Sequence, residues 1–153
     1  MFTLMPTRLI SRHRIAALVV EDDPDLATLL ESQLALDPAY ERIELAGDGS
    51  RALALLDSGF VPQVVLLDLE LPKVHGRDVL RRLREDTRFA RTVVVITGSE
   101  GRPDPSEASL PGEVWLPKPF GPEDLSFAIQ MAVARLEPDG AGTRPVSRGA
   151  ISA

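Results

Sequence analysis

Residues 64–76 read VVLLDLELPKVHG, and the rest of the chain can be interpreted outward from this stretch. Its first four residues are continuously apolar and end at an acid, Asp68. A short run of Val and Leu is typical of a strand that is covered on both faces, as in a parallel sheet. Open parallel sheets bind ligands outside the carboxyl ends of their strands, which is where Asp68 would lie. Asp68 is therefore the first candidate functional residue.

Four more apolar runs predict four more strands, and segments with helical spacing lie between the runs. The predicted strands are Ile15–Val20, Ile43–Ala46, Val64–Leu67, Val93–Thr97 and Val114–Leu116. The predicted helices cover Leu26–Leu34, Ser50–Ser58, Arg77–Asp86 and Leu125–Leu136. Asp23 stands directly before Pro24, which is the pattern of an N-cap followed by a first-turn proline. Alternating strands and helices predict a doubly wound α/β domain with a five-stranded parallel sheet.

One interval departs from this alternation. Residues 98–113 read GSEGRPDPSEASLPGE, and their three prolines leave little room for a helix of more than about two turns. The helix expected between the fourth and fifth strands is thus predicted to be short or replaced by a loop. We expect an N-terminal extension at 1–14, one domain at 15–136 and a flexible tail at 137–153, where apolar periodicity ends.

The composition excludes several classes of function. Of the 153 residues, 23 are acidic and 17 are basic, for a formal net charge of −6, and this balance disfavours nucleic acid as the main partner. The absence of cysteine excludes disulfides and thiolate metal sites. No apolar run reaches the roughly 18 residues of a membrane span, and the basic N-terminus lacks the apolar core of a signal peptide. We expect a cytoplasmic protein with no membrane partner.

Further polar residues follow other predicted strands. Glu21 and Asp22 follow the first strand, Thr97 ends the fourth and Lys118 follows the fifth. A parallel sheet brings these strand ends to one edge, so the carboxylates would repel one another without a cation. All-oxygen ligands favour Mg²⁺, which would neutralise an incoming phosphoryl group while a carboxylate acts as nucleophile. Lys118 and the Thr97 hydroxyl would contact phosphoryl oxygens.

As a set, these motifs resemble the response-regulator receiver domains of two-component signalling. The motifs are Glu21-Asp22 after LVV, Asp68 within VVLLDLELPKVHG, Thr97-Gly98 after VVVI, and Lys118-Pro119-Phe120. The resemblance covers about residues 15 to 136 and implies the flavodoxin-like strand order 2-1-3-4-5.

The resemblance also implies roles for individual residues. Asp68 would accept the phosphoryl group and would bind Mg²⁺ together with Asp22. The backbone carbonyl of Glu70 would complete the protein ligands, and Glu21 would act through water. Thr97 would be the switch hydroxyl, and Lys118 would bind the phosphoryl group and precede a cis peptide bond at Pro119. Trp115 would be either a rotating switch aromatic or a passive core residue, and Asp23 would serve the helix cap.

The predicted function is a stand-alone response regulator that is not a dedicated enzyme. It would accept a phosphoryl group from a sensor histidine kinase and signal through phosphorylation-switched protein–protein contacts. One alternative is an aspartate-nucleophile phosphatase or phosphotransferase, although enzymes of the haloacid-dehalogenase type carry a second aspartate where this chain has Glu70. Another alternative is a degenerate receiver that binds its partners without phosphorylation. A DNA-binding regulator would need a further domain.

Two predictions concern partners. The wording of residues 66–99 is closest to single-domain regulators that include partners of phytochrome-type kinases, which often form homodimers. The apolar stripe from Leu125 to Leu136 is longer than one face of a small sheet needs. We therefore expect a homodimer through the last strand and the last helix rather than through the proline-rich loop, in which the second subunit covers an exposed patch near Val133 and Leu136.

Overall fold

The protein is built on a five-stranded parallel sheet in the order β2-β1-β3-β4-β5. The structure is a computed structural model that describes residues 14–71, 76–99 and 112–136. The strands are β1 (Ile15–Val20), β2 (Tyr40–Ala46), β3 (Val64–Asp68), β4 (Val93–Gly98) and β5 (Glu113–Pro117). The order and the parallel pairing confirm the predicted doubly wound fold.

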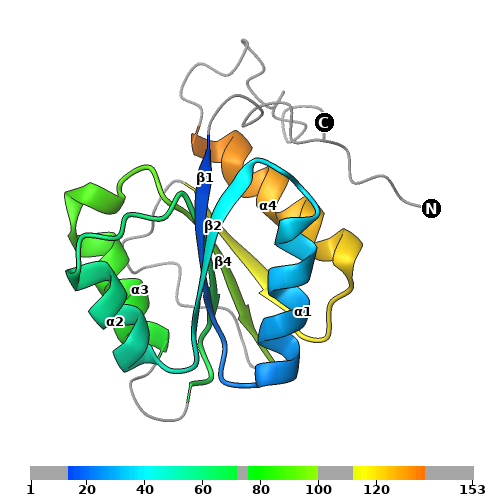
Figure 1. Cartoon of the computed structure of the whole chain (residues 1–153), viewed down its shortest axis with the longest axis horizontal. Coiled ribbons are helices and arrows are strands. Elements are labelled where there is room, and N and C mark those ends of the chain that lie inside the picture. Colours follow the sequence, from blue (N-terminus) through cyan, green and yellow to red (C-terminus); the bar gives the residue numbers. More distant parts are fainter. Residues whose placement is uncertain (1–13, 72–75, 100–111, 137–153) are drawn as a thin grey trace, which may run out of the picture.

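Helices cover both faces of the sheet (Figure 1). The helices are α1 (Pro24–Ala35), α2 (Gly49–Asp57), α3 (Gly76–Glu85) and α4 (Pro122–Leu136), with a short 3-10 turn at Thr87–Phe89. Helices α1 and α4 lie on one face, and α2 and α3 lie on the other. The predicted loop between β4 and β5 falls mainly on residues 100–111, outside the described residues, as do most of the predicted extension and all of the predicted tail.

The continuously apolar runs of the sequence form the most deeply buried strands of the sheet. Every residue of β3 and β4 is buried, because each of these strands has a neighbour on both sides and helices above and below. Strand β2 begins three residues earlier than predicted, at Tyr40 rather than Ile43. The difference arises because β2 is an edge strand that tolerates the exposed side chains of Glu41 and Arg42. Its pairing with β1 continues to Tyr40 through a register irregularity at Glu41, between the pairs Ile15–Tyr40 and Ala16–Arg42.

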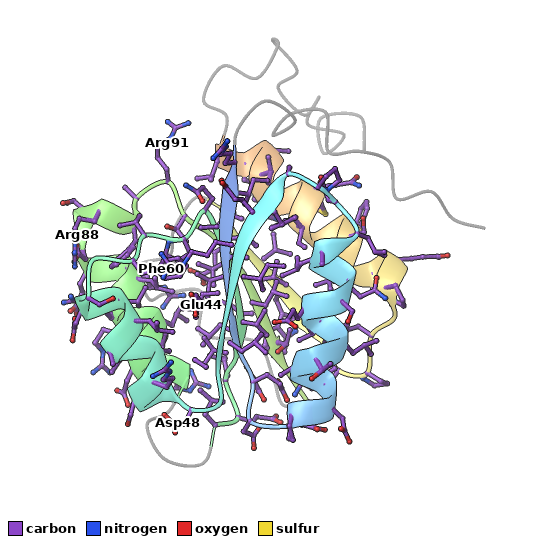
Figure 2. All side chains as sticks on the ribbon, viewed as in Figure 1. Glu44, Asp48, Phe60, Arg88 and Arg91 are labelled. Carbon is purple, nitrogen blue, oxygen red and sulfur yellow. The ribbon has the colours of Figure 1, made fainter. Side chains whose placement is uncertain are left out.

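Two apolar clusters fill the spaces between the sheet and its helices (Figure 2). One joins β-strand side chains to α1 and α4, and the other joins the opposite face to α2 and α3. At the margin of the second cluster, the Arg42 guanidinium lies 4.4 Å from the centre of the Phe60 ring. Burial of both faces explains why the central strands read as continuous rather than alternating apolar runs.

Helix α1 begins as the sequence predicts. Asp23 has extended backbone angles, and its Oδ1 accepts hydrogen bonds from the backbone N–H groups of Asp25 (2.9 Å) and Leu26 (3.4 Å). Pro24 occupies the first turn, where its missing N–H has no cost. The predicted N-cap role of Asp23 is therefore confirmed.

The outer face of α4 differs from the prediction. Val133 is buried, and Leu136 packs against the same core cluster and lies close over Gly112. The expected exposed patch at these two residues is wrong, because the C-terminal end of α4 lies over the beginning of β5, where Arg135 reaches the Glu113 carbonyl, and so stays over the sheet. The exposed apolar side chains of α4 are instead Phe127, 64% exposed, and Met131, 37% exposed.

The two helical layers also differ in charge. Helices α1 and α4 together carry four acids and one arginine. Helices α2 and α3 carry five arginines and three acids. The face covered by α2 and α3 is therefore positive relative to the face covered by α1 and α4.

Candidate phosphorylation and metal site

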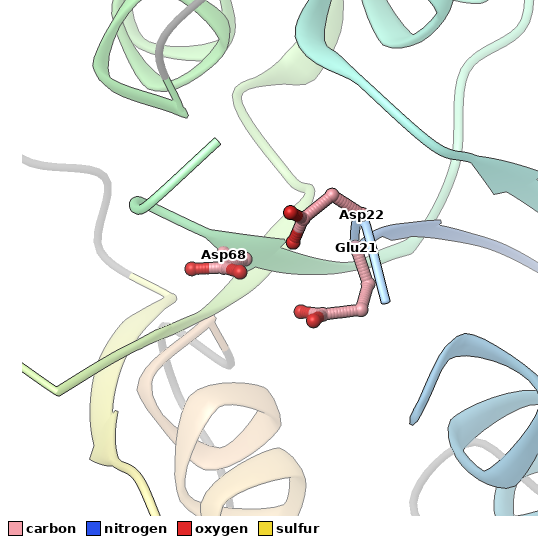
Figure 3. A group of neighbouring side chains, drawn as sticks. All are labelled: Glu21, Asp22 and Asp68. Carbon is pink, nitrogen blue, oxygen red and sulfur yellow. The ribbon is translucent and has the colours of Figure 1, made fainter. Parts of the chain in front are cut away.

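Three carboxylates meet where β1 and β3 end (Figure 3). Glu21 and Asp22 follow β1 directly, and Asp68 is the last residue of β3. Because Val20 pairs with Leu67 in parallel register, the two strand ends lie side by side. Each of the three side chains offers an oxygen within 4.8 Å of the other two. The structure thus brings together the acids that the sequence placed on separate strands.

The three acids differ in burial. Glu21 is 3% exposed and Asp68 is 2% exposed, whereas Asp22 is open to solvent. Burial, and then the neighbouring charge of Asp68, raise the pKa of Glu21 to about 7. Ionisation of a carboxyl group with this pKa costs free energy at neutral pH, and a bound cation would offset that cost.

Lys118 joins the carboxylates from the end of β5. Its Nζ lies 3.1 Å from Asp68 Oδ2 and 3.3 Å from Glu21 Oε2. Burial by itself would lower the pKa of Lys118, but the hydrogen bond to Asp68 and the charge of Glu21 hold that pKa above its ordinary value. Lys118 is therefore a fixed positive charge beside Asp68. The Lys118-Pro119 peptide bond is cis, as predicted.

Thr97 and Trp115 lie on the next two strands. Thr97 pairs directly with Asp68 in the sheet and is 4% exposed, and its Oγ1 is 3.5 Å from the carbonyl of Leu67. Trp115 is half-buried, and its ring lies over Gly98, where an added Cβ would be 3.0 Å from Trp115 Cη2. Both interpretations of Trp115 stay open, because it packs on the core and also contacts the residue after Thr97.

Glu70 contributes to the site through its backbone and its side chain. Its backbone N–H donates to Asp68 Oδ1 at 2.8 Å. Its carboxylate Oε1 accepts from the backbone N–H of Ser99 at 2.8 Å and from the Ser99 hydroxyl at 2.6 Å. The Ser99 contact was not predicted, since no sequence signal pairs residues 29 positions apart. The predicted metal-binding role of the Glu70 carbonyl stays a prediction.

Gly76 is a further site residue that the sequence analysis did not single out. A Cβ at this position would be 2.3 Å from the backbone oxygen of Asp68 and 2.6 Å from the Cα of Leu69. Only glycine fits there, so the start of α3 packs directly on the backbone that carries the phosphoacceptor candidate. The helix predicted from the sequence begins one residue later, at Arg77, whereas α3 begins at Gly76.

The donor set fits Mg²⁺. Within the described ranges, the candidate metal group consists of Glu21, Asp22 and Asp68, which offer carboxylate oxygens. Hard oxygen donors are typical of Mg²⁺ and Ca²⁺ sites, whereas zinc sites use histidine and cysteine. Asp22, which is exposed, leaves the group open on one side.

None of the helices at residues 14–71, 76–99 and 112–136 combines the length and the apolar character that a membrane span requires.

Comparisons with known proteins agree with this geometry. The family model "Response regulator receiver domain" matches residues 17–130. The transcriptional regulatory protein CpxR of Klebsiella pneumoniae is 34% identical over 118 residues, which cover 77% of this chain and 49% of that protein. The DNA-binding response regulator MtrA of Mycolicibacterium smegmatis is 36% identical over 141 residues, 85% of this chain and 54% of that protein. The chain thus spans about half the length of these relatives.

A solved structure shows the same fold. The receiver domain of the sensor histidine kinase PA1611 from Pseudomonas aeruginosa matches with a TM-score of 0.62 at 24% identity, over 78% of this chain and 98% of that one. That structure has a magnesium ion coordinated in its active-site cleft. The present chain belongs to the response regulator receiver domain family of two-component systems.

Proposed function

We propose that the protein accepts a phosphoryl group on Asp68 from the phosphohistidine of a sensor histidine kinase, in a Mg²⁺-dependent step. The observation that carries the proposal is the grouping of Glu21, Asp22 and Asp68, whose carboxylate oxygens lie within 4.8 Å of one another, together with Lys118 Nζ at 3.1 Å from Asp68 Oδ2. A solvated surface acid would have neither the burial of Asp68 nor a fixed cation beside it.

The proposed chemistry follows from these contacts. An Asp68 carboxylate oxygen attacks phosphorus, and the new O–P bond forms as the P–N bond of the donor phosphohistidine breaks. Bound Mg²⁺ supplies charge neutralisation for the transferred phosphoryl oxygens. Lys118, already 3.1 Å from Asp68, moves its hydrogen bond to a phosphoryl oxygen. The Thr97 hydroxyl, on the strand next to Asp68, then donates to another oxygen.

We assign the metal to Asp22 and Asp68 directly, to the backbone carbonyl of Glu70, and to Glu21 through water. The exposed position of Asp22 supports a direct role, since an exposed carboxylate is free to turn toward the ion. Glu21 is already 3.3 Å from Lys118, which supports a more distant role.

The two alternative functions are less well supported. A haloacid-dehalogenase-type phosphatase would use the residue two positions after the nucleophile as general acid or base. Here that residue is Glu70, whose carboxylate is hydrogen-bonded to Ser99. A degenerate receiver would have no reason to keep buried Glu21 and Asp68 side by side with Lys118, since unneutralised burial of acids costs free energy.

We propose further that phosphorylation changes contacts with other proteins. The expectations of a stand-alone regulator, a phytochrome-type kinase, a cytoplasmic location, and no nucleic-acid or membrane partner stay predictions. The relatives give these expectations no support, because the relatives are about twice as long as this chain and include regulators named as DNA-binding.

A homodimer through α4 is part of the proposal. The original basis, exposure of Val133 and Leu136, does not hold, but Phe127 and Met131 lie one helical turn apart on the exposed side of the same helix. Two apolar side chains at i and i+4 form one strip that a two-fold partner could cover with its own copy.

The test uses acetyl phosphate and beryllofluoride, each with Mg²⁺. We expect the wild type to gain the mass of one phosphoryl group, and the Asp68→Asn variant to gain none, because the amide is not a nucleophile. Labelling of Asp68→Asn at the wild-type rate would overturn the proposal. Labelling of the wild type that continues unchanged after a chelator removes Mg²⁺ would overturn it too. Steady turnover of many equivalents of a phosphomonoester would instead favour the phosphatase alternative.

A further inference from the structure

Arg84 ties the end of α3 to the beginning of β5. Its Nε donates to Glu113 Oε2 at 3.1 Å, and its Nη2 donates to Glu113 Oε1. Both side chains are only 10% exposed. A two-pronged contact between a guanidinium and a carboxylate fixes orientation as well as distance. Glu113 is therefore held in one position relative to α3.

Glu113 is the first residue of an edge strand. Strand β5 pairs only with β4 within the described sheet, and Val114 and Leu116 lie in the same core cluster as residues of α4. Because no described strand lies on the outer side of β5, contacts from helices add to this pairing in holding the strand. Arg135 adds a second contact at the same residue, where its Nη1 donates to the Glu113 carbonyl at 2.6 Å. Two helices thus hold the first residue of β5.

The other end of β5 carries the lysine of the site. The strand ends at Pro117, and Lys118 follows with its backbone N–H on the Gly98 carbonyl at 3.0 Å. An extended strand does not shorten or stretch easily, because its rise of about 3.3 Å per residue is set by backbone geometry. A shift of Glu113 along the strand axis is therefore passed on to Lys118.

Helix α3 closes the path back to the phosphoacceptor. It begins at Gly76, in contact with the backbone oxygen of Asp68, and Arg84 lies near its opposite end, about 12 Å farther along. The contacts run from Asp68 through α3 to Arg84, across to Glu113, along β5 to Lys118, and back to Asp68 Oδ2. The ion pair is the one side-chain link in this path that lies far from the site.

We infer that Arg84 is a positioning residue for Lys118, and that its ion pair with Glu113 sets the place of Lys118 Nζ for contact with the phosphoryl group. The inference rests on the proposed phosphorylation of Asp68. It predicts that loss of the pair weakens the step that needs Lys118 and spares metal binding by Asp22, which follows β1, and by Asp68, which ends β3.

The test compares two ligands on the same variants by calorimetry. Wild type and Arg84→Met are titrated with Mg²⁺ alone, and then with beryllofluoride at saturating Mg²⁺. We expect Mg²⁺ affinity within about twofold of wild type, and beryllofluoride affinity lower by about tenfold, the cost of one misplaced charge-assisted hydrogen bond. Arg81→Met is the matched control, because Arg81 lies on the same helix with a side chain 67% exposed, and it should match wild type with both ligands.

A second variant separates positioning from stability. Arg84→Met removes one partner of the part-buried Glu113 carboxylate, which destabilises the fold, whereas Arg84→Met with Glu113→Met removes both charges and should unfold at a urea concentration closer to that of wild type. If Arg84 positions Lys118, the double variant still binds beryllofluoride about tenfold more weakly. A charge-reversed pair, Arg84→Glu with Glu113→Arg, should recover part of the loss.

Each other outcome counts against the inference. Beryllofluoride affinity equal to wild type in the folded double variant would make the ion pair purely structural. An equal loss of Mg²⁺ and beryllofluoride affinity would mean that the whole site has loosened. If the wild type itself bound Mg²⁺ but no beryllofluoride, the proposed function would fail and this inference with it, and that result is distinct from a difference between variants.

Discussion

Among single residues, the consecutive acids Glu21, Asp22 and Asp23 illustrate how neighbours in sequence take different roles. Glu21 points inward and is 3% exposed beside Lys118. Asp22 is exposed and belongs to the carboxylate group. Asp23 caps α1 through its Oδ1. Stability and metal binding should therefore be separable within these three residues.

Replacing Asp23 by alanine should lower the free energy of unfolding by about 1 kcal/mol, because two N–H groups of α1 lose their acceptor. Mg²⁺ affinity should stay within about twofold, since the cap carboxylate is engaged by the helix. Urea unfolding and calorimetry measure the two quantities. Asp23→Asn is the control, because asparagine is an equally good N-cap.

Asp22→Ala should show the opposite pattern. An exposed side chain with no cap role should change stability by less than about 0.5 kcal/mol. Loss of one charged ligand should weaken Mg²⁺ binding by at least about tenfold. A reversed result, with Asp23 essential for Mg²⁺ and Asp22 for stability, would shift the metal site by one residue.

The raised pKa of Glu21 gives the metal-free protein a pH dependence with a definite sign. The folded-state pKa is about 7, above the ordinary value of 4.5, so the folded state binds the proton more tightly than the unfolded state. This contribution to stability is complete below about pH 4.5 and is lost as pH rises through about 7. Glu21→Gln cannot lose a proton and should retain it.

Unfolding in urea without divalent cations measures the effect. Between about pH 5 and pH 8, wild type should lose on the order of 1 kcal/mol more stability than Glu21→Gln. Glu31→Gln, a half-buried acid on α1 outside the site, is the control and should follow wild type. Parallel pH profiles for wild type and Glu21→Gln would contradict the role assigned to Glu21.

At the scale of helices and strands, the sequence was informative wherever burial was two-sided. The predicted strand Ile15–Val20 matches β1 residue for residue, and Asp68 and Lys118 fall where parallel strand ends meet. The hydrophobic periodicity of the sequence also located α4, but it does not indicate how far the sheet extends beneath the helix. The exposure of Val133 was therefore misjudged.

Contacts between distant side chains were beyond the sequence analysis. The arginines of α3 look like a solvated helix face, and Arg81 is indeed exposed. Arg84, however, is part-buried and forms an ion pair with Glu113, 29 residues later. Hydrophobic periodicity records which side of a helix is apolar, and it carries no information about which charge on another element will reach across.

The start of α3 gives a prediction at the same scale. Gly76→Ala should lower the free energy of unfolding by about 1–3 kcal/mol, because the added Cβ would be 2.3 Å from backbone oxygen that cannot turn aside. It should also slow labelling of Asp68, whose backbone must shift. Gly47→Ala is the matched control, with nothing within 4 Å of its added Cβ. Equal stability of the two variants would show that α3 can move freely.

For the whole molecule, the proposed dimer predicts a mass. Light scattering at micromolar concentration should give twice the chain mass of 16.6 kDa, in the presence or absence of beryllofluoride. Phe127→Glu with Met131→Glu should give monomers, because two charges would have to be buried at the contact. Leu36→Glu is the control, since Leu36 is a similarly exposed apolar residue at the C-cap of α1. A monomer mass for wild type under both conditions would exclude the dimer.

The unequal charge of the two helical layers has a consequence for how the molecule meets others. The helices on the two sides of the sheet carry opposite net charges, and these helix charges make an electric dipole roughly perpendicular to the sheet (Figure 1). In the field of an acidic partner the molecule turns its α2–α3 side forward before any contact forms, which speeds productive encounters. Salt screens this orienting interaction to a range of about 8 Å at physiological ionic strength. The association rate should therefore fall with added salt, while the lifetime of the complex should change little.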